Sequence, residues 1–221
     1  MFPLYFVSTF FLMNYQISPI LFFTVVYFAI AQYFRGVLKI HSIVHCVSAV
    51  LLNSYILFYT TGINIFTTSF CSLSQQVNIS ALYFPAYNSL GYFIADSIDI
   101  FLDWKNVKRR VFLIHHFSAI LGILTIFAGS RLVNYAVWSL EIGGIVHHLK
   151  HASEIYQYRQ IPAYTLYFLV YTTSRVLLFL NCNYCLTTPL TNSEIFGILI
   201  SYLLILQNAM WIYQNLKKLI F

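Results

Sequence analysis

Long apolar stretches dominate the sequence and restrict its fold more than any motif does. Of its 221 residues, 60% are hydrophobic and 8% are charged, whereas soluble proteins carry about 25% charged residues. A helix crosses the bilayer core with about 20 apolar residues. Seven stretches meet this requirement, at residues 17–34, 43–60, 81–101, 112–129, 132–149, 163–181 and 195–214. The sequence therefore predicts an all-α, polytopic membrane helix bundle of about seven transmembrane helices, without room for a separate soluble domain.

The basic residues predict how this bundle is oriented. Lys and Arg favour the cytosolic side of a membrane in short loops. If seven helices alternate in direction, Arg131 falls on one side and all other loop Lys and Arg residues fall on the opposite side. The latter are Arg35, Lys39, Lys105, Lys108, Arg109, Arg110, Lys150, Arg159, Lys217 and Lys218. We therefore expect a cytosolic C-terminus. A basic rim facing anionic lipid accounts for most of the formal net charge of +6 without nucleic acid as a partner.

The beginning of the chain does not have the pattern of a signal peptide. The first residues, MFPLYFVSTFFLM, lack a basic region and a cleavage site with small residues. We predict that residues 1–34 form a lead-in and the first transmembrane helix, the lead-in lying at the membrane interface or extending that helix.

Three cysteines and one glycosylation sequon fall on the predicted lumenal side. Cys182 and Cys185 form a single C-x-x-C pair, which cannot supply the four ligands of a structural zinc site. A disulfide among Cys71, Cys182 and Cys185 is open, as is use of the sequon that begins at Asn78.

Ionisable residues within the predicted spans indicate a polar site. Each costs about 2.5 to 3.5 kcal/mol on insertion scales. Asp96, Asp99, Glu141 and Arg175 together would therefore cost about 10 kcal/mol, comparable with the net stability of a typical protein. We expect them to be paired, hydrogen-bonded or wetted by a cavity. With Asp103, the two aspartates have the spacing i, i+3, i+7 and share one helix face.

Histidines are predicted to lie at the same depth as these residues, near the cytosolic leaflet. They lie at the cytosolic ends of three predicted spans. The first of these spans has His45, the second has the pair His115 and His116, and the third has His147, His148 and His151. Neighbouring residues are about 100° apart around a helix, so one histidine of the pair can point inward and the other sideways.

Simpler interpretations remain open for several of these residues. His41, His147 and His151 can be interfacial side chains, Asp103 and Glu154 can belong to a solvated rim, and Arg175 can pair with an acid to hold helices together.

Four segments resemble the TLC-domain family in order and spacing: SLGYFIAD (89–96), FLIHHFSAILGI (112–123), SLEI (139–142) and TTSRVLLF (172–179). This family includes ceramide synthases, translocating-chain-associated membrane proteins and small stand-alone TLC proteins, and the sequence is most similar to the last group. The resemblance implies that residues 35–221 form a TLC domain. It also implies helices around a lipid-sized cavity and a location in the endoplasmic reticulum.

The resemblance also implies a set of site residues. In ceramide synthases, a His-His pair and two later aspartates line the site where a fatty acyl group passes from acyl-CoA to a sphingoid amine. His115, His116 and Glu141 match the pair and the first aspartate, whereas Gly144 stands at the second aspartate position. Small TLC proteins follow their glutamate with a small polar residue and Asn-Pro, which the chain replaces with Gly143-Gly144-Ile145. The chain thus departs from both patterns.

Acyl transfer is chemically coherent with these residue types. An amine loses a proton as it attacks a thioester, and a histidine can accept that proton while a carboxylate orients the ring. We predict that His116 acts as base or transient acyl acceptor, with His115 as its partner and Glu141 as the orienting group.

The remaining predictions concern binding. The predicted substrate-binding residues are Asp96, Asp99, His148 and Arg175, and the basic loop 105–110 is predicted to receive a coenzyme A phosphate. We expect no cofactor beyond acyl-CoA as co-substrate and no metal. Membrane lipids are the expected partners, and homo- or hetero-oligomerisation is open.

Two other functional classes stay open. One is a non-catalytic lipid-binding protein that regulates membrane composition or escorts cargo. The other is a metal enzyme, because His41-x-x-x-His45, His115-His116 and His147-His148-x-x-His151 loosely resemble the histidine boxes of membrane di-iron hydroxylases. Seven histidines are fewer than those boxes require, and their order differs.

Overall fold

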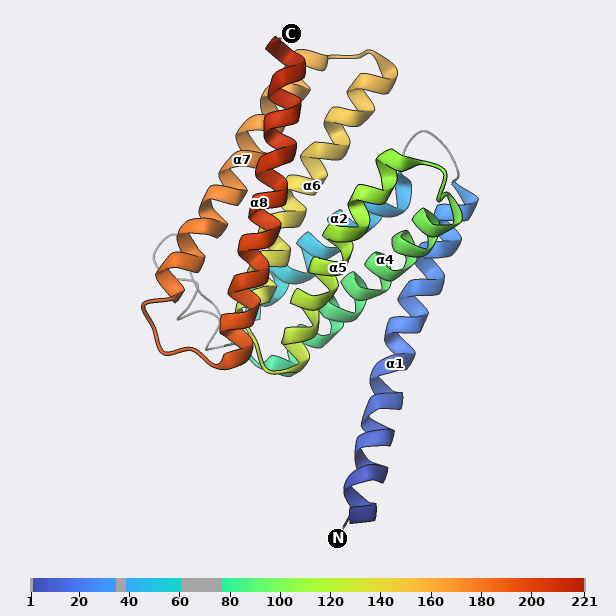
Figure 1. Cartoon of the computed structure of the whole chain (residues 1–221), viewed down its shortest axis with the longest axis vertical. Coiled ribbons are helices and arrows are strands. Elements are labelled where there is room, and N and C mark those ends of the chain that lie inside the picture. Colours follow the sequence, from blue (N-terminus) through green and yellow to red (C-terminus); the bar gives the residue numbers. More distant parts are fainter. Residues whose placement is uncertain (1, 35–38, 61–76, 221) are drawn as a thin grey trace.

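The computed structural model describes residues 2–34, 39–60 and 77–220, and every regular element within these ranges is helical (Figure 1). The elements are α1 (Phe2–Tyr33), α2 (Ile40–Ser54), the π-helical turn η1 (Tyr55–Thr60), the 3₁₀ turn η2 (Ile79–Leu82), α4 (Tyr83–Leu102), α5 (Val107–Phe127), α6 (Leu132–Tyr156), α7 (Gln160–Cys185) and α8 (Asn192–Ile220). The predicted all-α class is confirmed. The residues before position 17 extend the first helix.

Four helical segments of the described chain are long and apolar enough to cross a bilayer, which supports an integral membrane protein. They are Ile40–Phe58, Arg109–Phe127, Gln160–Cys185 and Asn192–Lys217. The predicted spans in α4 and α6 also form helices, of 20 and 25 residues. These two helices fall outside the most apolar group because they carry buried polar residues such as Asn88, Asp96, Asn134 and Lys150.

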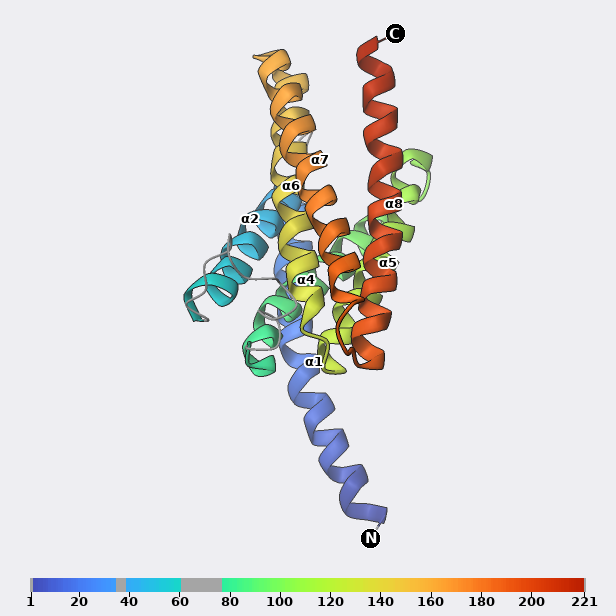
Figure 2. The same ribbon diagram turned by 90° about the vertical axis from the view of Figure 1, so that its left-hand side faces the viewer.

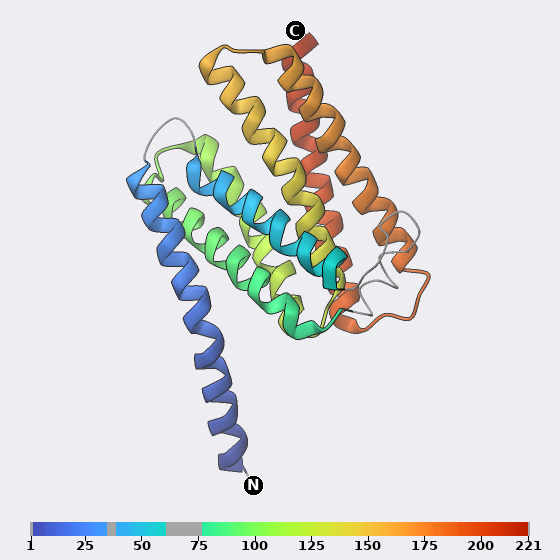
Figure 3. The same cartoon turned by 180° about the vertical axis from the view of Figure 1, so that it is seen from behind.

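The helices alternate in direction. The end of α4, the start of α5, the connection from α6 to α7 and the C-terminus all lie toward one end of the molecule (Figures 1 and 3). This alternation is the arrangement on which the predicted orientation depends. Arg131, which stands directly before α6, belongs to the connection at the other end.

Helix α6 occupies the centre of the bundle. It packs on α7, α2, α8 and α5, and Figure 2 shows α2 on one side of it and α5 and α8 on the other. α1 packs along α4, and its N-terminal half projects beyond the bundle (Figure 3). Side chains from α2, α7 and α8 therefore all approach α6.

Polar side chains are buried while large apolar side chains face outward, as expected for helices surrounded by lipid. His45, Asn53 and Ser89 are fully enclosed, whereas Leu169 and Leu206 are 63% and 62% exposed. The interior of the bundle is thus the place where a polar site can form.

Candidate functional site

Asp96 is the centre of a buried cluster built from α2, α4 and α5. Its Oδ1 lies 3.0 Å from His41 Nε2 and 3.6 Å from Arg109 Nη2, and its Oδ2 lies 3.4 Å from His116 Nε2. Lys39 Nζ is 4.0 Å away. His41 is buried and bonded to a carboxylate, so the interpretation of this histidine as an interfacial side chain is wrong.

Arg109 contacts all three aspartates of α4, which confirms that they share one face. Its Nη2 lies 2.6 Å from Asp99 Oδ2, and its Nη1 lies 3.2 Å from Asp103 Oδ2. Asp99 also pairs with Lys39 at 3.5 Å and accepts a hydrogen bond from Gln32 at 3.2 Å. Because the Arg109 guanidinium is neutralised by these carboxylates, it is poorly placed for the predicted contact with a coenzyme A phosphate.

The adjacent histidines His115 and His116 face different surroundings, as the helical geometry requires. His116 is 3% exposed, with its Nε2 at Asp96 and its Nδ1 3.2 Å from Ser97 Oγ. The Nδ1 of His115 lies 3.3 Å from Gln207 Oε1 on α8. Both ring nitrogens of His116 therefore have partners, while no bond to the Nε2 of His115 is found within the described chain.

A central cavity lies between α4, α5, α6 and α8, and His115 and Glu141 both line it. The other lining residues are Phe93, Ala119, Gly122, Ile123, Val133, Ala136, Val137, Leu140, Gly197, Ile200, Ser201 and Leu204. Its volume is about 30 Å³, which is room for a few water molecules. The expected lipid-sized cavity is therefore present only as a narrow space. A lipid chain can enter only if the surrounding helices separate.

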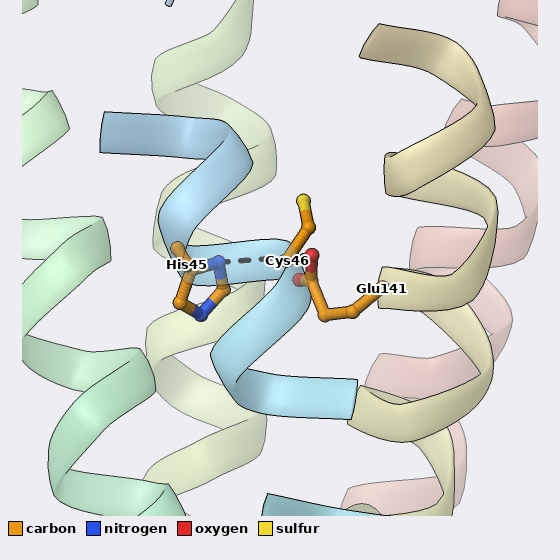
Figure 4. Close-up of side chains that lie close together, drawn as sticks. All are labelled: His45, Cys46 and Glu141. Carbon is orange, nitrogen blue, oxygen red and sulfur yellow. Dashed lines mark ion pairs between the residues drawn. The ribbon is translucent and has the colours of Figure 1, made fainter. Parts of the chain in front are cut away.

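Glu141 lies beside His45 and Cys46 rather than beside the His-His pair (Figure 4). Its Oε2 is 3.6 Å from His45 Nδ1. The side chain of His45 is completely buried, stacks on Tyr92 at 3.9 Å, and places its Nε2 3.2 Å from Ser89 Oγ. The prediction that Glu141 orients His115 or His116 is thus corrected, because the crossing of α2 and α6 places His45 against this carboxylate.

Arg175 forms a second buried site between α7 and α8. It donates to Ser174 Oγ at 2.8 Å and to Asn208 Oδ1 at 3.0 Å, and its guanidinium carbon lies 3.7 Å from the centre of the Tyr171 ring. Tyr171 also donates to Asn208. No carboxylate of the described residues lies within 4.0 Å of Arg175, so amide, hydroxyl and aromatic groups take the place of the expected acid.

The glycines of α6 make room for these side chains. A Cβ atom at Gly143 would lie 1.7 Å from Arg175 Nη1, and one at Gly144 would lie 2.7 Å from Cys46 Sγ. Glycine at these two positions therefore leaves space that side chains from α7 and α2 occupy.

His148 and the other histidines of α6 lie apart from the cavity lining. His148 is half-buried and contacts the ring of His147 at 5.7 Å, and His151 pairs with Glu154 at 3.4 Å near the end of the helix. Apart from His148, the predicted site residues thus form three groups, around Asp96, Glu141 and Arg175, instead of one chamber.

Several residues of these groups were not predicted. No pattern in the sequence indicated Cys46 as a site residue, apart from its position next to His45. Gln207 and Asn208 form a polar pair within the otherwise apolar stretch 195–214, which was a usable indication. Lys39 was assigned only to the basic rim, but its position before α2 brings it to Asp96 and Asp99.

Cys185, the last residue of α7, is disulfide-bonded, whereas Cys46 and Cys182 are free. The C-x-x-C pair is therefore not bonded to itself. Asn78 accepts hydrogen bonds from the backbone N–H and the hydroxyl of Ser80 at the start of η2.

Comparison with known proteins provides no relative: no family model, no curated protein and no solved structure matches the chain. Its function must be argued from the residues and their geometry.

Proposed function

We propose that the protein is a multi-pass membrane enzyme of lipid metabolism that transfers a fatty acyl group from acyl-CoA to a lipid amine. The observation that carries this proposal is that His115 and Glu141, from neighbouring helices, line the same apolar cavity. A base and a carboxylate in one apolar space are what the attack of an amine on a thioester requires. The motifs that resemble the TLC-domain family support the same chemistry.

His115 takes the role of general base in this proposal. Its Nδ1 faces an amide oxygen, that of Gln207, and therefore carries the ring proton. The neutral ring then has its lone pair on Nε2. As the amine nitrogen bonds to the thioester carbon, its proton passes to this Nε2, the carbon–sulfur bond breaks, and the proton goes on to the departing thiolate.

Glu141 stabilises the positive charge that develops on the amine and the imidazole. One of its oxygens, Oε2, lies at His45, and the side chain also borders the cavity. A carboxylate in such an apolar space interacts strongly with a nearby cation because little water screens the charges.

His116 is a positioning residue in this proposal. Its contacts with Asp96 and Ser97 join α5 to α4 immediately beside His115. Through Asp96 it is also connected to His41 of α2, so three helices are held together at the histidine pair.

The predicted orientation has additional support from Cys185. Disulfides persist in oxidising compartments. Cys185, which is disulfide-bonded, is the last residue of α7, whereas the basic Arg159 directly precedes its first residue. This agrees with a cytosolic C-terminus in a membrane of the secretory pathway, such as the endoplasmic reticulum.

The test is lipid analysis of cells that lack their own ceramide synthases and express the protein, His115→Gln or His151→Gln. His151 lies at the end of α6 and serves as the control. We expect N-acylated lipids with the wild type and the control. Since general base catalysis contributes about 10² to 10⁴-fold, we expect at least about a 100-fold loss with His115→Gln. Equal product from His115→Gln and wild type would refute the assignment.

The narrowness of the cavity favours a second function, that of a non-catalytic lipid-binding regulator of membrane composition. This function predicts altered proportions of existing lipids in the same cells and no N-acylated product. A purified protein that forms no amide from acyl-CoA and a sphingoid base in vesicles would favour it.

A further inference from the structure

We propose that His45, Cys46 and Glu141 bind a transition metal ion, with Zn²⁺ as the best match, at the contact of α2 with α6. The proposal concerns a site distinct from the transfer chemistry, with Glu141 as the single residue common to both.

The ligand atoms of the three residues already lie close together. The ring nitrogen of His45, the sulfur of Cys46 and a carboxylate oxygen of Glu141 are all within 4.8 Å of one another, and His45 Nδ1 is 3.6 Å from Glu141 Oε2. Zinc bonds of about 2.0 to 2.3 Å in a tetrahedron separate neighbouring ligand atoms by about 3.3 to 3.6 Å. The longest separation therefore needs to shorten by little more than about 1 Å, which a small side-chain rotation provides.

The His45 ring is held with one nitrogen directed at this point. Its Nε2 lies at Ser89 Oγ, and the ring stacks on Tyr92 with an interplanar angle of 7°. Its Nδ1 is completely buried and has no hydrogen-bond partner. A metal-bound histidine typically donates its other ring N–H to a neighbouring oxygen, which is the arrangement that Ser89 provides.

The contact between His45 and Glu141 is unfavourable without a cation between the two side chains. If Nε2 carries the proton toward Ser89, Nδ1 presents a lone pair to a carboxylate oxygen at 3.6 Å, and two acceptors then face each other in a buried space. If Nδ1 carries the proton instead, 3.6 Å is too long for a good N–H···O bond. A metal ion between the two atoms satisfies both.

Gly144 has no side chain and therefore leaves space for the Cys46 thiol. A Cβ atom at this position would lie 2.7 Å from Cys46 Sγ and 3.2 Å from Glu141 Oε2. The ligand charges also fit a divalent ion, since a thiolate and a carboxylate together carry two negative charges and the histidine is neutral. On binding, the Cys46 thiol releases its proton.

The donor set indicates which metal is bound. A thiolate, an imidazole and a carboxylate match Zn²⁺, whereas Mg²⁺ and Ca²⁺ prefer oxygen ligands alone. Three protein ligands leave a fourth position open, as in catalytic zinc sites. Of the three ligands, Glu141 also lines the central cavity.

The experiment measures metal bound to the purified full-length chain in detergent after incubation with Zn²⁺ and removal of the excess. Cys46→Ser is compared with Cys182→Ser, which changes a second free cysteine that is buried within the described chain. Cys182 belongs to α7 and packs in an apolar cluster with Tyr135, Ala136 and Leu178. We expect about one zinc per chain in the wild type and in Cys182→Ser. Loss of an outer-shell partner alone weakens metal affinity about 10 to 100-fold, so Cys46→Ser should weaken it more than about 100-fold.

Binding of Co²⁺ in place of zinc gives a second readout that does not depend on the stability of a variant. The wild type should show a thiolate-to-cobalt charge-transfer absorption in the near ultraviolet, and Cys46→Ser should lack it. Substoichiometric zinc in the wild type, or equal zinc content and cobalt spectra in Cys46→Ser and Cys182→Ser, would overturn the proposal.

The outcome is separable from that of the proposed acyl transfer. His115→Gln should abolish transfer and keep the metal, because His115 is not a ligand. Metal binding by a protein without transfer activity would refute the proposed function alone, and transfer by a protein without metal would refute the metal site alone.

Discussion

Exchanging Asp96 for asparagine tests whether the buried cluster of α2, α4 and α5 holds the bundle together by charge. Asparagine keeps the shape of the side chain, and its single oxygen can still accept a hydrogen bond from His41, while its amide group takes the place of the Oδ2 atom that contacts His116. What it removes is the negative charge 3.6 Å from Arg109 Nη2 and 4.0 Å from Lys39 Nζ.

The size of the effect follows from burial and from the remaining partners. Removing one partner of a buried ion pair costs about 3 to 5 kcal/mol. Arg109 keeps Asp99 at 2.6 Å and Asp103 at 3.2 Å, so we expect the lower end, about 3 kcal/mol. For a chain of this size, that corresponds to a decrease in the thermal unfolding midpoint of about 6 to 12 °C.

The matched control is Asp103→Asn, the same substitution at an acid that contacts the same guanidinium. The side chain of Asp103 is 49% exposed, against 10% for Asp96, and exposed ion pairs contribute about 0 to 1 kcal/mol. Thermal unfolding of both variants is followed in the same detergent. A midpoint for Asp96→Asn that falls no further than that of Asp103→Asn would show that burial does not strengthen the pairing, and the reasoning would be wrong.

Two further predictions concern the contacts of α6 and the oxidation state of the cysteines. Gly143→Ala places a methyl group against Arg175 Nη1, and overpacking of this kind costs about 1 to 3 kcal/mol. The midpoint of thermal unfolding should therefore be lower than that of the control His151→Gln. An unchanged midpoint would contradict the close approach of Arg175 to the backbone of α6. Maleimide labelling of unfolded, unreduced protein should modify Cys46 and Cys182 and leave Cys185 unmodified until a reductant is added; modification of Cys185 before reduction would contradict the disulfide.

The helices could be predicted because their apolar residues form long uninterrupted stretches. The common face of Asp96, Asp99 and Asp103 was also predictable, because a spacing of three and four residues defines a face in any α-helix. Arg109, which contacts all three, confirms it. These features depend only on local geometry.

The partners of the polar residues could not be predicted, because they depend on how helices cross. Helical periodicity states that His115 and His116 diverge, but it does not state which of them faces the cavity. The packing of α5 on α8 decides this by placing Gln207 at His115. In the same way, Glu141 contacts His45 because α2 and α6 pack against each other, and His45 is distant in sequence from the His-His pair.

The two glycines of α6 explain why the polar groups separate instead of sharing one chamber. An acid at position 144 would add a second carboxylate beside Glu141, but it would also displace the Cys46 thiol, which lies 2.7 Å from where its Cβ would be. A side chain at position 143 would displace the Arg175 guanidinium in the same manner. Because both positions are glycine, α2 and α7 insert a thiol and a guanidinium against the backbone of α6. Glu141, one turn earlier, is left as the acid that faces the cavity. Glu141 therefore lines the cavity together with His115 and also contacts His45.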